Sequence, residues 1–470
     1  MLTNRLYRGD TVASMSGDTV PVTGWGRTAP TVARVIRPRT YEEAAAAVRD
    51  CGTRGAVARG LGRAHGDAAQ NAGGAVLDMT GLDRVHVIDA AEGIVLCDAG
   101  ISLRRLTEVL LPLGWLPPVA PGTRHVTVGG AIGADVHGRN QHVSGSFCRH
   151  VLSLELLTAD GEVRTVRPGT PLFEATTGGL GLTGVILTAT FRLLPVETAY
   201  LTVRTERAAG LDDLLARMTT GDHRHRYSAA WIDLLARGPA TGRAVLRRAD
   251  HTPLDALGGH TRVWRQPLSS GPRRLPAPAA LVPDGLLGRT TAGLLNELRH
   301  RTAPRARTGR IQHLSAYFHP LDGLPHRNRL YGRGGFVQYQ FVLGHGREEV
   351  LHRVVRRIAA HRCPSLLAVL QRFGDGDPGW LSFPVPGWSL ALDVPAALPG
   401  LPSLLDGLDE EIAAAGGRVC LAKDSRLRPE LLAAMYPRVA DFRALRAELD
   451  PRGVFVSDLA RRLDLHTPRS

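Results

Sequence analysis

The sequence predicts an α+β protein built from two regions of different texture. Up to about residue 197, short strands alternate with helices, and two glycine-rich loops interrupt the pattern. In residues 198–415, long alternating strands such as "GGFVQYQFVL" mix with helices such as "REEVLHRVVRRIAAHR". From about residue 416 the chain reads as strand, loop, helix and polar tail. We therefore expect three segments: 1–197, 198–415 and 416–470.

The elements of the first region follow in order. Residues 1–30 read as an irregular arm. Thr40 is the expected N-cap of a helix that stops at Gly52, and Ser102 is the expected N-cap of an amphipathic helix that ends at Gly114. The expected strands are 31–38, 55–60, 75–80, 85–89, 93–100 and 184–195, with a hairpin over 150–166 that turns at Asp160-Gly161. An Arg/Pro-rich stretch near 266–283 reads as a loop or mobile segment.

Composition excludes several protein classes. The chain has 470 residues, 43% of them hydrophobic, and a net charge of +14, but its arginines are scattered rather than gathered in a patch. We therefore expect no nucleic-acid partner. No run of about 18 apolar residues and no signal-peptide core occurs. The five cysteines show no metal-binding spacing, so no metal is expected, and a reducing cytoplasm is the expected compartment, with peripheral membrane contact left open.

Two glycine-rich loops are the first candidate ligand sites. "ARGLGRAHGDAAQ" (58–70) follows a strand, and its glycines allow the amides to form a nest for phosphate oxygens. In "PGTRHVTVGGAIGADVHGRN" (121–140), Gly129 and Gly130 lead into a helical turn that could face a pyrophosphate. Neither loop is GxGxxG before a helix, so a Rossmann site is a poor fit. Alone, either loop could be a surface turn; two, each with a histidine, favour a ligand site.

Lys423 is the only lysine, beside 57 arginines. An exposed cation can be either residue, whereas a site that needs a compact ammonium with a tunable pKa cannot use arginine. The alternatives are a functional amine or chance survival of a lysine at the surface.

The motifs together resemble a known family of flavoenzymes. The two loops, "LTADGEVR" and "GGLGLTGVI" resemble the FAD-binding domain of the vanillyl-alcohol-oxidase superfamily. Motifs in order from about residue 25 to 465 resemble the decaprenylphosphoryl-ribose 2′-oxidase family: "RGLGRAHGDAAQNAGG", "PGTRHVTVGGAIGADVHGRN", "SAAWIDLLA", "GGFVQYQFV", "LSFPVPGW", "AKDSR", "AMYPRV" and "DPRGVFVSDLARRL". The resemblance implies a PCMH-type FAD-binding domain from 1–197 and 416–470, with an antiparallel-sheet substrate domain, 198–415, covering the flavin.

The resemblance also implies an activity. The family oxidises the 2-hydroxyl of a lipid-phosphate-linked ribofuranose, passing hydride to flavin N5, and a separate NAD(P)H-dependent reductase completes the epimerisation to arabinose. The alternatives are an oxygen-using oxidase of a secondary-metabolite sugar, nucleoside or polyol, and a flavin-free interaction protein that retains only the fold.

The expected site residues follow from the resemblance and from strand alternation. Lys423 and His137 match catalytic positions, although His137 could instead be a structural histidine. In "GGFVQYQFVL", Gln338 and Gln340 share one strand face, and Val337, Tyr339 and Phe341 share the other. The remaining pocket positions are Trp231, Phe318 and Ala391, with Tyr331, Phe336 and Trp388 as further apolar matches. The expected FAD contacts are Arg59, Gly60, Leu61, Gly62, Arg63, Ala64, His65, Gly66, Asp67, Gly122, Thr127, Val128, Gly129, Gly130, His137, Gly138, Arg139, Asn140, Ile186 and Cys420.

Several positions depart from the family pattern. Ala391 stands where the mycobacterial relatives have cysteine, Gln371 where they have lysine, and Phe318 and Cys420 where they have tyrosine. These departures bear on the contacts to the phosphate side of the substrate. His65 replaces a tyrosine at a position that is bonded to flavin in some sugar oxidases. A covalent FAD link to His65 and simple packing of His65 on the flavin ring are both open.

Overall fold

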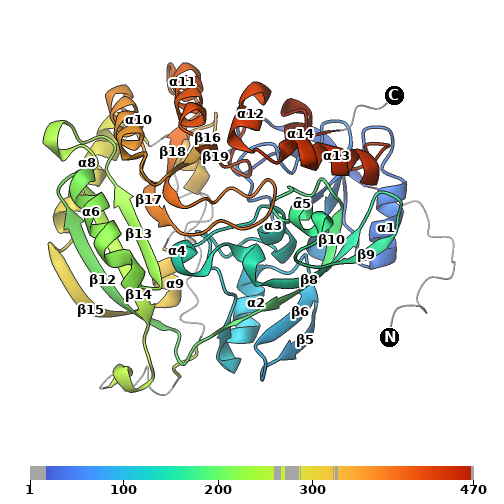
Figure 1. Ribbon diagram of the computed structural model, residues 1–470, viewed down its shortest axis with the longest axis horizontal. Helices are drawn as coiled ribbons and strands as arrows, with labels where there is room; N and C mark the ends of the chain where they lie inside the picture. Colours follow the sequence, from blue (N-terminus) through green and yellow to red (C-terminus); the bar gives the residue numbers. More distant parts are fainter. Residues whose placement is uncertain are drawn as a thin grey trace.

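The computed structural model describes residues 17–258, 266–269, 285, 287–320, 322 and 327–466. Two smaller sheets lie at one end of the molecule and a large antiparallel sheet lies at the other, with helices α10–α14 along one side (Figure 1). This is the α+β architecture that the sequence predicts. Most of the Arg/Pro-rich stretch 266–283 lies outside the described residues.

The N-terminal region contains a four-stranded and a five-stranded sheet. The first has the order β1-β2-β4-β3, with β2, β4 and β3 parallel, and the second is antiparallel with the order β5-β6-β10-β8-β9. The strands are β1 (Asp18–Val22), β2 (Thr31–Ile36), β3 (Ala56–Arg59), β4 (Ala75–Asp78), β5 (Val85–Asp89), β6 (Ile94–Asp98), β8 (Val151–Leu157), β9 (Val163–Val166) and β10 (Val185–Arg192), with a small pair β7 (Trp115–Leu116) and β11 (Leu194–Pro195).

Capping residues set the helix starts as predicted. The side chain of Thr40 accepts a hydrogen bond from the Glu43 amide at the start of α1 (Tyr41–Arg49), and Ser102 accepts from the Arg105 amide at the start of α2 (Leu103–Leu110). The remaining helices here are α3 (Val128–Gly133), α4 (Gln141–Ser144) and α5 (Pro171–Thr176).

Two sequence-based expectations for this region need correction. The expected irregular arm is wrong over Asp18–Val22, because these residues pair antiparallel with β2 as strand β1. Residues 1–16 lie outside the described part of the chain. The hairpin β8–β9 forms as expected, but its loop spans 158–162, with Gly161 in the left-handed conformation at φ 86°, rather than a two-residue turn.

The central region builds an eight-stranded antiparallel sheet, in the order β15-β12-β14-β13-β17-β18-β16-β19. Its strands are β12 (Tyr200–Ala208), β13 (Tyr227–Ile232), β14 (Ala244–His251), β15 (Ala306–His313), β16 (Phe336–Gly344), β17 (Ala368–Phe373), β18 (Gly387–Pro395) and β19 (Arg418–Val419). The helices are α6 (Leu211–Gly221), α8 (Arg289–Thr302), α9 (Leu314–Phe318), α10 (Glu348–His361) and α11 (Leu401–Ala414).

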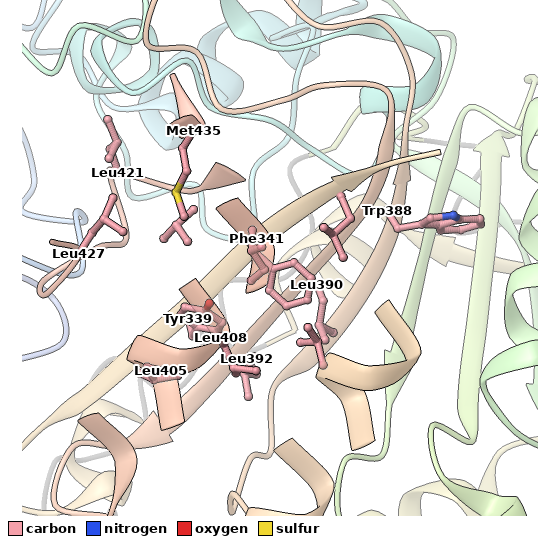
Figure 2. Packing of buried hydrophobic residues seen from close by; sticks show 14 of the residues in the cluster. Tyr339, Phe341, Trp388, Leu390, Leu392, Leu405, Leu408, Leu421, Leu427 and Met435 are labelled. Atoms are coloured by element: carbon pink, nitrogen blue, oxygen red, sulfur yellow. The ribbon is translucent and has the colours of Figure 1, made fainter. Parts of the chain in front are cut away.

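One face of this sheet packs into the largest hydrophobic core of the described residues. Tyr339 and Phe341 from β16 and Leu390 and Leu392 from β18 contact α11 through side chains such as Leu408 (Figure 2). Because side chains alternate along a strand, Gln338 and Gln340 lie on the opposite face. The core therefore fixes which face of the sheet can carry polar chemistry.

The C-terminal segment crosses from the large sheet back to the N-terminal sheets. After β19 come α12 (Pro429–Met435), α13 (Val439–Leu449) and α14 (Asp458–Arg462), so the single helix expected here is replaced by three. Phe455 then forms a parallel bridge with Ala56 of β3. The buried Arg446 joins the two regions, since it donates hydrogen bonds to the carbonyls of Leu182 and Phe455. Within the described ranges, no helix is both long and apolar enough to span a membrane.

Candidate active site

A cavity of about 390 Å³ lies between the N-terminal glycine loops and the polar face of the large sheet. Its walls come from the loop after β3, from residues 120–139, from the turn before β10, from strands β16, β17 and β18, and from the loop after β19. Segments more than 300 residues apart in the sequence therefore share one cavity.

Most of the residues predicted for the site line this cavity. They are Arg59, Gly60, Leu61, Gly62, Arg63, Ala64, His65, Gly122, Thr127, Gly129, Gly130, His137, Gly138, Arg139, Ile186, Phe318, Gln338, Gln340, Ala391, Cys420 and Lys423. Five predicted residues do not line it: Gly66, Asp67, Val128, Asn140 and Trp231.

Gly66 and Asp67 hold the glycine loop to the C-terminal segment. A Cβ atom on Gly66 would lie 1.8 Å from the carbonyl oxygen of Asp424, so only glycine allows this contact. Asp67 accepts two hydrogen bonds from Arg462, at 2.8 and 3.0 Å, and Arg462 also forms an ion pair with Asp424 at 2.9 Å. Both residues therefore position the loop that carries Lys423, and neither was expected to do so.

The other three predicted residues that do not line the cavity lie in the protein interior. Val128 packs in the core beneath α3, and the side chain of Asn140 donates to the carbonyl of Pro118. Trp231 is 4% exposed, and its indole donates to the carbonyl of Leu366. Tyr331, Phe336 and Trp388, also expected in the pocket, are buried in hydrophobic clusters.

The two glycine loops meet, and the first offers a run of free amides. A Cβ on Gly60 would lie 2.2 Å from Thr127 Oγ1, so the loops pack directly against one another. Within the described residues, no acceptor hydrogen-bonds the amides of Leu61, Gly62 and Ala64, which leaves a nest for phosphate oxygens.

Three amides of the second glycine loop, at the start of α3, are already used. Those of Val128 and Gly129 donate to the carbonyls of Ile101 and Ala99, and that of Gly130 donates to Thr127 Oγ1. The expectation that a pyrophosphate lies on the amides of Thr127–Gly130 is therefore wrong for Val128, Gly129 and Gly130, although Gly129 and Gly130 do line the cavity. For the Thr127 amide it stays a prediction.

Lys423, His137 and Gln340 meet at one end of the cavity. Gln340 Nε2 lies 3.0 Å from His137 Nε2 and donates to Ser389 Oγ at 2.9 Å. Its carbonyl oxygen is buried and has no hydrogen-bond partner within the described residues. If the amide nitrogen is the donor, His137 Nε2 is the acceptor and the ring proton sits on Nδ1. The unpaired oxygen of Gln340 is then placed to accept a hydrogen bond from a ligand hydroxyl.

Burial sets the charge states of the two catalytic candidates. It lowers the pKa of His137 to about 3, with the positive charge of Lys423 as the second cause, so His137 is neutral. Burial also lowers the pKa of Lys423 below its usual value, while Cys420 and Asp393 act in the opposite direction. Lys423 is half-buried and lines the cavity, which favours a contact with a ligand over an ordinary surface cation.

Asp393 is a positioning residue that the sequence reasoning missed. It is 2% exposed, and its carboxylate accepts hydrogen bonds from Gln338 Nε2 at 2.5 Å and from the Tyr331 hydroxyl at 3.3 Å. Asp393 lies two residues after Ala391 on β18, so strand alternation could have indicated it. The turn residues Leu180, Gly181 and Gly184 also line the cavity, and they lie in the quoted motif "GGLGLTGVI".

The cavity suits FAD because it combines a nest of free amides, glycine walls and a polar end with an amine and amide groups. The chain matches the FAD binding domain family over residues 32–167 and the D-arabinono-1,4-lactone oxidase family over residues 403–463. The protein therefore has an FAD-binding domain, as the sequence resemblance implies.

Three curated relatives are informative. An uncharacterized protein in the mprA 5′ region of Streptomyces coelicolor is 57% identical over 374 residues, which is 78% of this chain and 100% of that protein. Decaprenylphosphoryl-beta-D-ribose oxidase of Mycolicibacterium smegmatis is 43% identical over 449 residues, 94% of this chain and 97% of that enzyme. Alditol oxidase of a Streptomyces species is 26% identical over 453 residues, 94% of this chain and 98% of that enzyme.

The matches to the two named enzymes extend over nearly the whole chain and agree with the glycine loops, the polar sheet face and the half-buried lysine on the cavity. The chain belongs to the family of FAD-dependent oxidoreductases, acting on CH–OH groups, that includes decaprenylphosphoryl-beta-D-ribose oxidase.

Proposed function

We propose that the protein oxidises the 2-hydroxyl of a ribofuranose linked through phosphate to a polyprenyl carrier. The product is the 2-keto sugar, and an NAD(P)H-dependent reductase then completes an epimerisation to the arabinose form. The M. smegmatis relative, whose name gives decaprenylphosphoryl-ribose as the compound it oxidises, supports this choice. The observation that carries it is the meeting of Lys423, His137, Gln338 and Gln340 on one cavity beside the glycine loops. A lipid carrier also implies peripheral contact with a membrane.

FAD, when bound, supplies the acceptor for the hydride that leaves the sugar carbon. Lys423 Nζ hydrogen-bonds the reacting hydroxyl and takes its proton, because a lowered pKa leaves more of the amine uncharged than in an exposed lysine. His137 stays neutral and fixes the amide of Gln340 through Nε2.

The two glutamines orient the sugar. Their amide nitrogens are held by protein acceptors, by Asp393 for Gln338 and by Ser389 and His137 for Gln340. Each therefore presents its carbonyl oxygen to the sugar hydroxyl groups. Asp393 and Ser389 act on the substrate through these glutamines, and the charge of Asp393 also opposes the lowering of the pKa of Lys423.

We also propose the domain division 1–197 with 416–470 for FAD and 198–415 for the substrate. The bridge between Phe455 and Ala56 supports the return of the C-terminal segment to the FAD-binding domain. Pairing of β19 with β16 means that this segment also completes the edge of the substrate sheet.

An oxygen-using oxidase of a free sugar, nucleoside or polyol is the second candidate. Gln371, where the mycobacterial relatives have lysine, donates its side-chain amide to the carbonyl of Gly138 at 3.1 Å and adds no charge to the cavity. His65 lines the cavity where covalently flavinylated sugar oxidases have their linking histidine. Acid precipitation tests the link, because a yellow pellet means a bond to His65 and a yellow supernatant means packing alone.

Anaerobic mixing with candidate substrates tests the proposal. We expect a short-chain polyprenylphosphoryl ribose to bleach the flavin absorbance faster than nucleosides or free polyols. Bleaching by a free polyol alone, followed by rapid reoxidation in air, would instead support the second candidate. If no sugar bleaches the flavin, both candidate functions are refuted.

A further inference from the structure

Beside the cavity lies a cluster of three arginines, to which the proposed chemistry assigns no role. Arg139 lines the cavity, and its guanidinium carbon lies 4.7 Å from the centre of the Tyr317 ring. Arg247 of β14 lies 4.8 Å from the centre of the same ring, so these two cations are close neighbours. Arg299 of α8 lies 4.6 Å from the centre of the Trp231 ring. We call Arg139, Arg247 and Arg299 the arginine cluster.

The strand register places the cluster on the same sheet face as the cavity. Gln340 pairs with Ala391, Ala391 with Val369, and Val369 with Trp231, so these four side chains form one row across four strands. Gln340, Ala391 and Val369 all line the cavity. Trp231 continues the row to the place where Arg299 lies over it. Trp231 thus supports an arginine of the cluster instead of lining the pocket.

Arg247 extends the same face by one more strand. Trp231 pairs with Val245 on β14, and Arg247 lies two residues farther along that strand, on the same face. Arg139 reaches the cluster from the opposite wall, just after the loop that carries His137. Arg139 is thus the member of the cluster that lines the cavity, and Arg247 and Arg299 extend the cluster beyond the row of Gln340, Ala391 and Val369.

No carboxylate neutralises the cluster within the described residues. Neighbouring arginines are paired: Arg243 contacts Asp233 and Glu297, and Arg301 contacts Glu297 at 2.5 Å. Burial, followed by the charges of Arg247 and Arg139, lowers the pKa of Arg299 to about 10. Arg139 and Arg247 are half-buried, and Arg299 is exposed at the edge of the cluster. Like charges held close together destabilise a protein unless an anion joins them. Stacking on Tyr317 and Trp231 keeps the three cations in place without removing any charge.

We propose that the arginine cluster binds the phosphoryl group of the substrate, an inference that rests on the proposed sugar oxidation. A phosphoryl group carries several acceptor oxygens and negative charge, which suits forked guanidinium donors approaching from different directions. It also accounts for the neutral Gln371 in the cavity, because the positive charge for the phosphate lies in the cluster instead. The phosphoryl group could come from a lipid-linked phosphodiester or from a free sugar phosphate.

The test is binding of inorganic phosphate to the FAD-loaded protein, measured by thermal melting against chloride at equal ionic strength. We expect phosphate to stabilise the wild type, and Arg247→Gln and Arg299→Gln each to weaken its affinity by about 10-fold or more. Arg301→Gln is the matched control, since Arg301 is on the same helix as Arg299 and is paired with Glu297. We expect it to bind phosphate as the wild type does.

Two further readouts make the outcome decisive. Without phosphate, Arg299→Gln should melt above the wild type, because it relieves repulsion; a lower melting temperature with unchanged phosphate affinity would show a structural role. Equal stabilisation by phosphate and chloride, or equal loss in the Arg301 control, would overturn the proposal as well.

Two substrates distinguish the sources and separate this inference from the proposed function. Flavin bleaching by a short polyprenylphosphoryl ribose but not by ribose 5-phosphate assigns the lipid-linked source, and the reverse result assigns the free sugar phosphate. If no sugar bleaches the flavin, the phosphate-binding results still decide whether the arginine cluster binds a phosphoryl group. If neutral and phosphorylated ribose bleach the flavin equally fast, the proposed sugar oxidation is supported and the assignment of the cluster as a phosphoryl site is wrong.

Discussion

At the scale of single residues, Lys423 shows how a compositional bias can reveal function. A chain with 57 arginines offers no reason to keep a lysine at the surface. The structure places Lys423 half-buried on the wall of the cavity. Strand alternation likewise predicted the shared face of Gln338 and Gln340. By contrast, no local pattern could show that Asp67 binds Arg462, because that partner lies 395 residues away.

The paired environments of His137 and Lys423 predict the pH dependence of the reaction. Because His137 has a pKa of about 3, we expect the rate of flavin reduction to show no transition near the usual histidine pKa of ~6.5. Replacing Lys423 with Met removes a positive neighbour and should raise the pKa of His137. A titration of the histidine resonances measures that shift. A wild-type transition near pH 6.5 that disappears in His137→Asn would contradict the account.

At the scale of elements, the contacts that each glycine loop makes with its neighbours decide which of its amides are free to bind a ligand. The second glycine loop looked like an anion site, but its Val128 and Gly129 amides donate to carbonyls just after β6 and hold α3 there. The first loop keeps free amides and touches the C-terminal loop through Gly66. A sequence shows that glycines are present, but not whether a ligand or a neighbouring backbone occupies the space beside each one.

Gly66→Ala tests this contact between loops. Its Cβ would collide with the Asp424 carbonyl, so we expect a loss of about 1–3 kcal/mol in the free energy of unfolding and slower flavin reduction, because the Lys423 loop must move. Gly293→Ala is the control: a Cβ there meets nothing within 4 Å, and alanine favours the helix α8. Denaturant unfolding compares the two. Equal stabilities would show that the loops do not make this contact.

At the scale of the whole molecule, the sequence predicted the division into two α+β regions because hydrophobic periodicity is local. It did not predict strand β1, which pairs on an exposed edge, or two of the three C-terminal helices. The cavity depends on the return of the chain from the large sheet to β3 and on the register of β16, β17 and β18. Only the family resemblance indicated that arrangement before the structure did.

Histidines with lowered pKa values predict how stability changes with pH. Burial lowers the pKa of His125, His137, His150, His251, His300, His313, His319 and His345. Below pH ~6.5 the unfolded chain binds protons that the folded chain does not, so this stability is complete above pH ~6.5 and is lost as the pH falls.

Melting temperatures between pH 7.5 and 5 check this expectation. We expect a fall toward pH 5 and a shallower fall in His251→Gln, since the pKa of His251 is lowered to about 4. Asp135 acts in the opposite direction, because burial and Asp377 raise its pKa to about 7, so its carboxylate destabilises the fold as the pH rises. A melting temperature that is constant or rises toward pH 5 would show that the folded protein does not lower the pKa values of these histidines.

The central claim is that Lys423 acts on the reacting hydroxyl in an FAD-dependent sugar oxidation. Stopped-flow flavin reduction by polyprenylphosphoryl ribose, under anaerobic conditions, tests it most directly when wild type and Lys423→Arg are compared. Arginine keeps the charge but replaces a small amine with a wide fork that cannot take a proton. We predict that the variant folds, retains FAD and reduces its flavin about 10²–10³-fold more slowly. A wild-type rate in Lys423→Arg would contradict the claim.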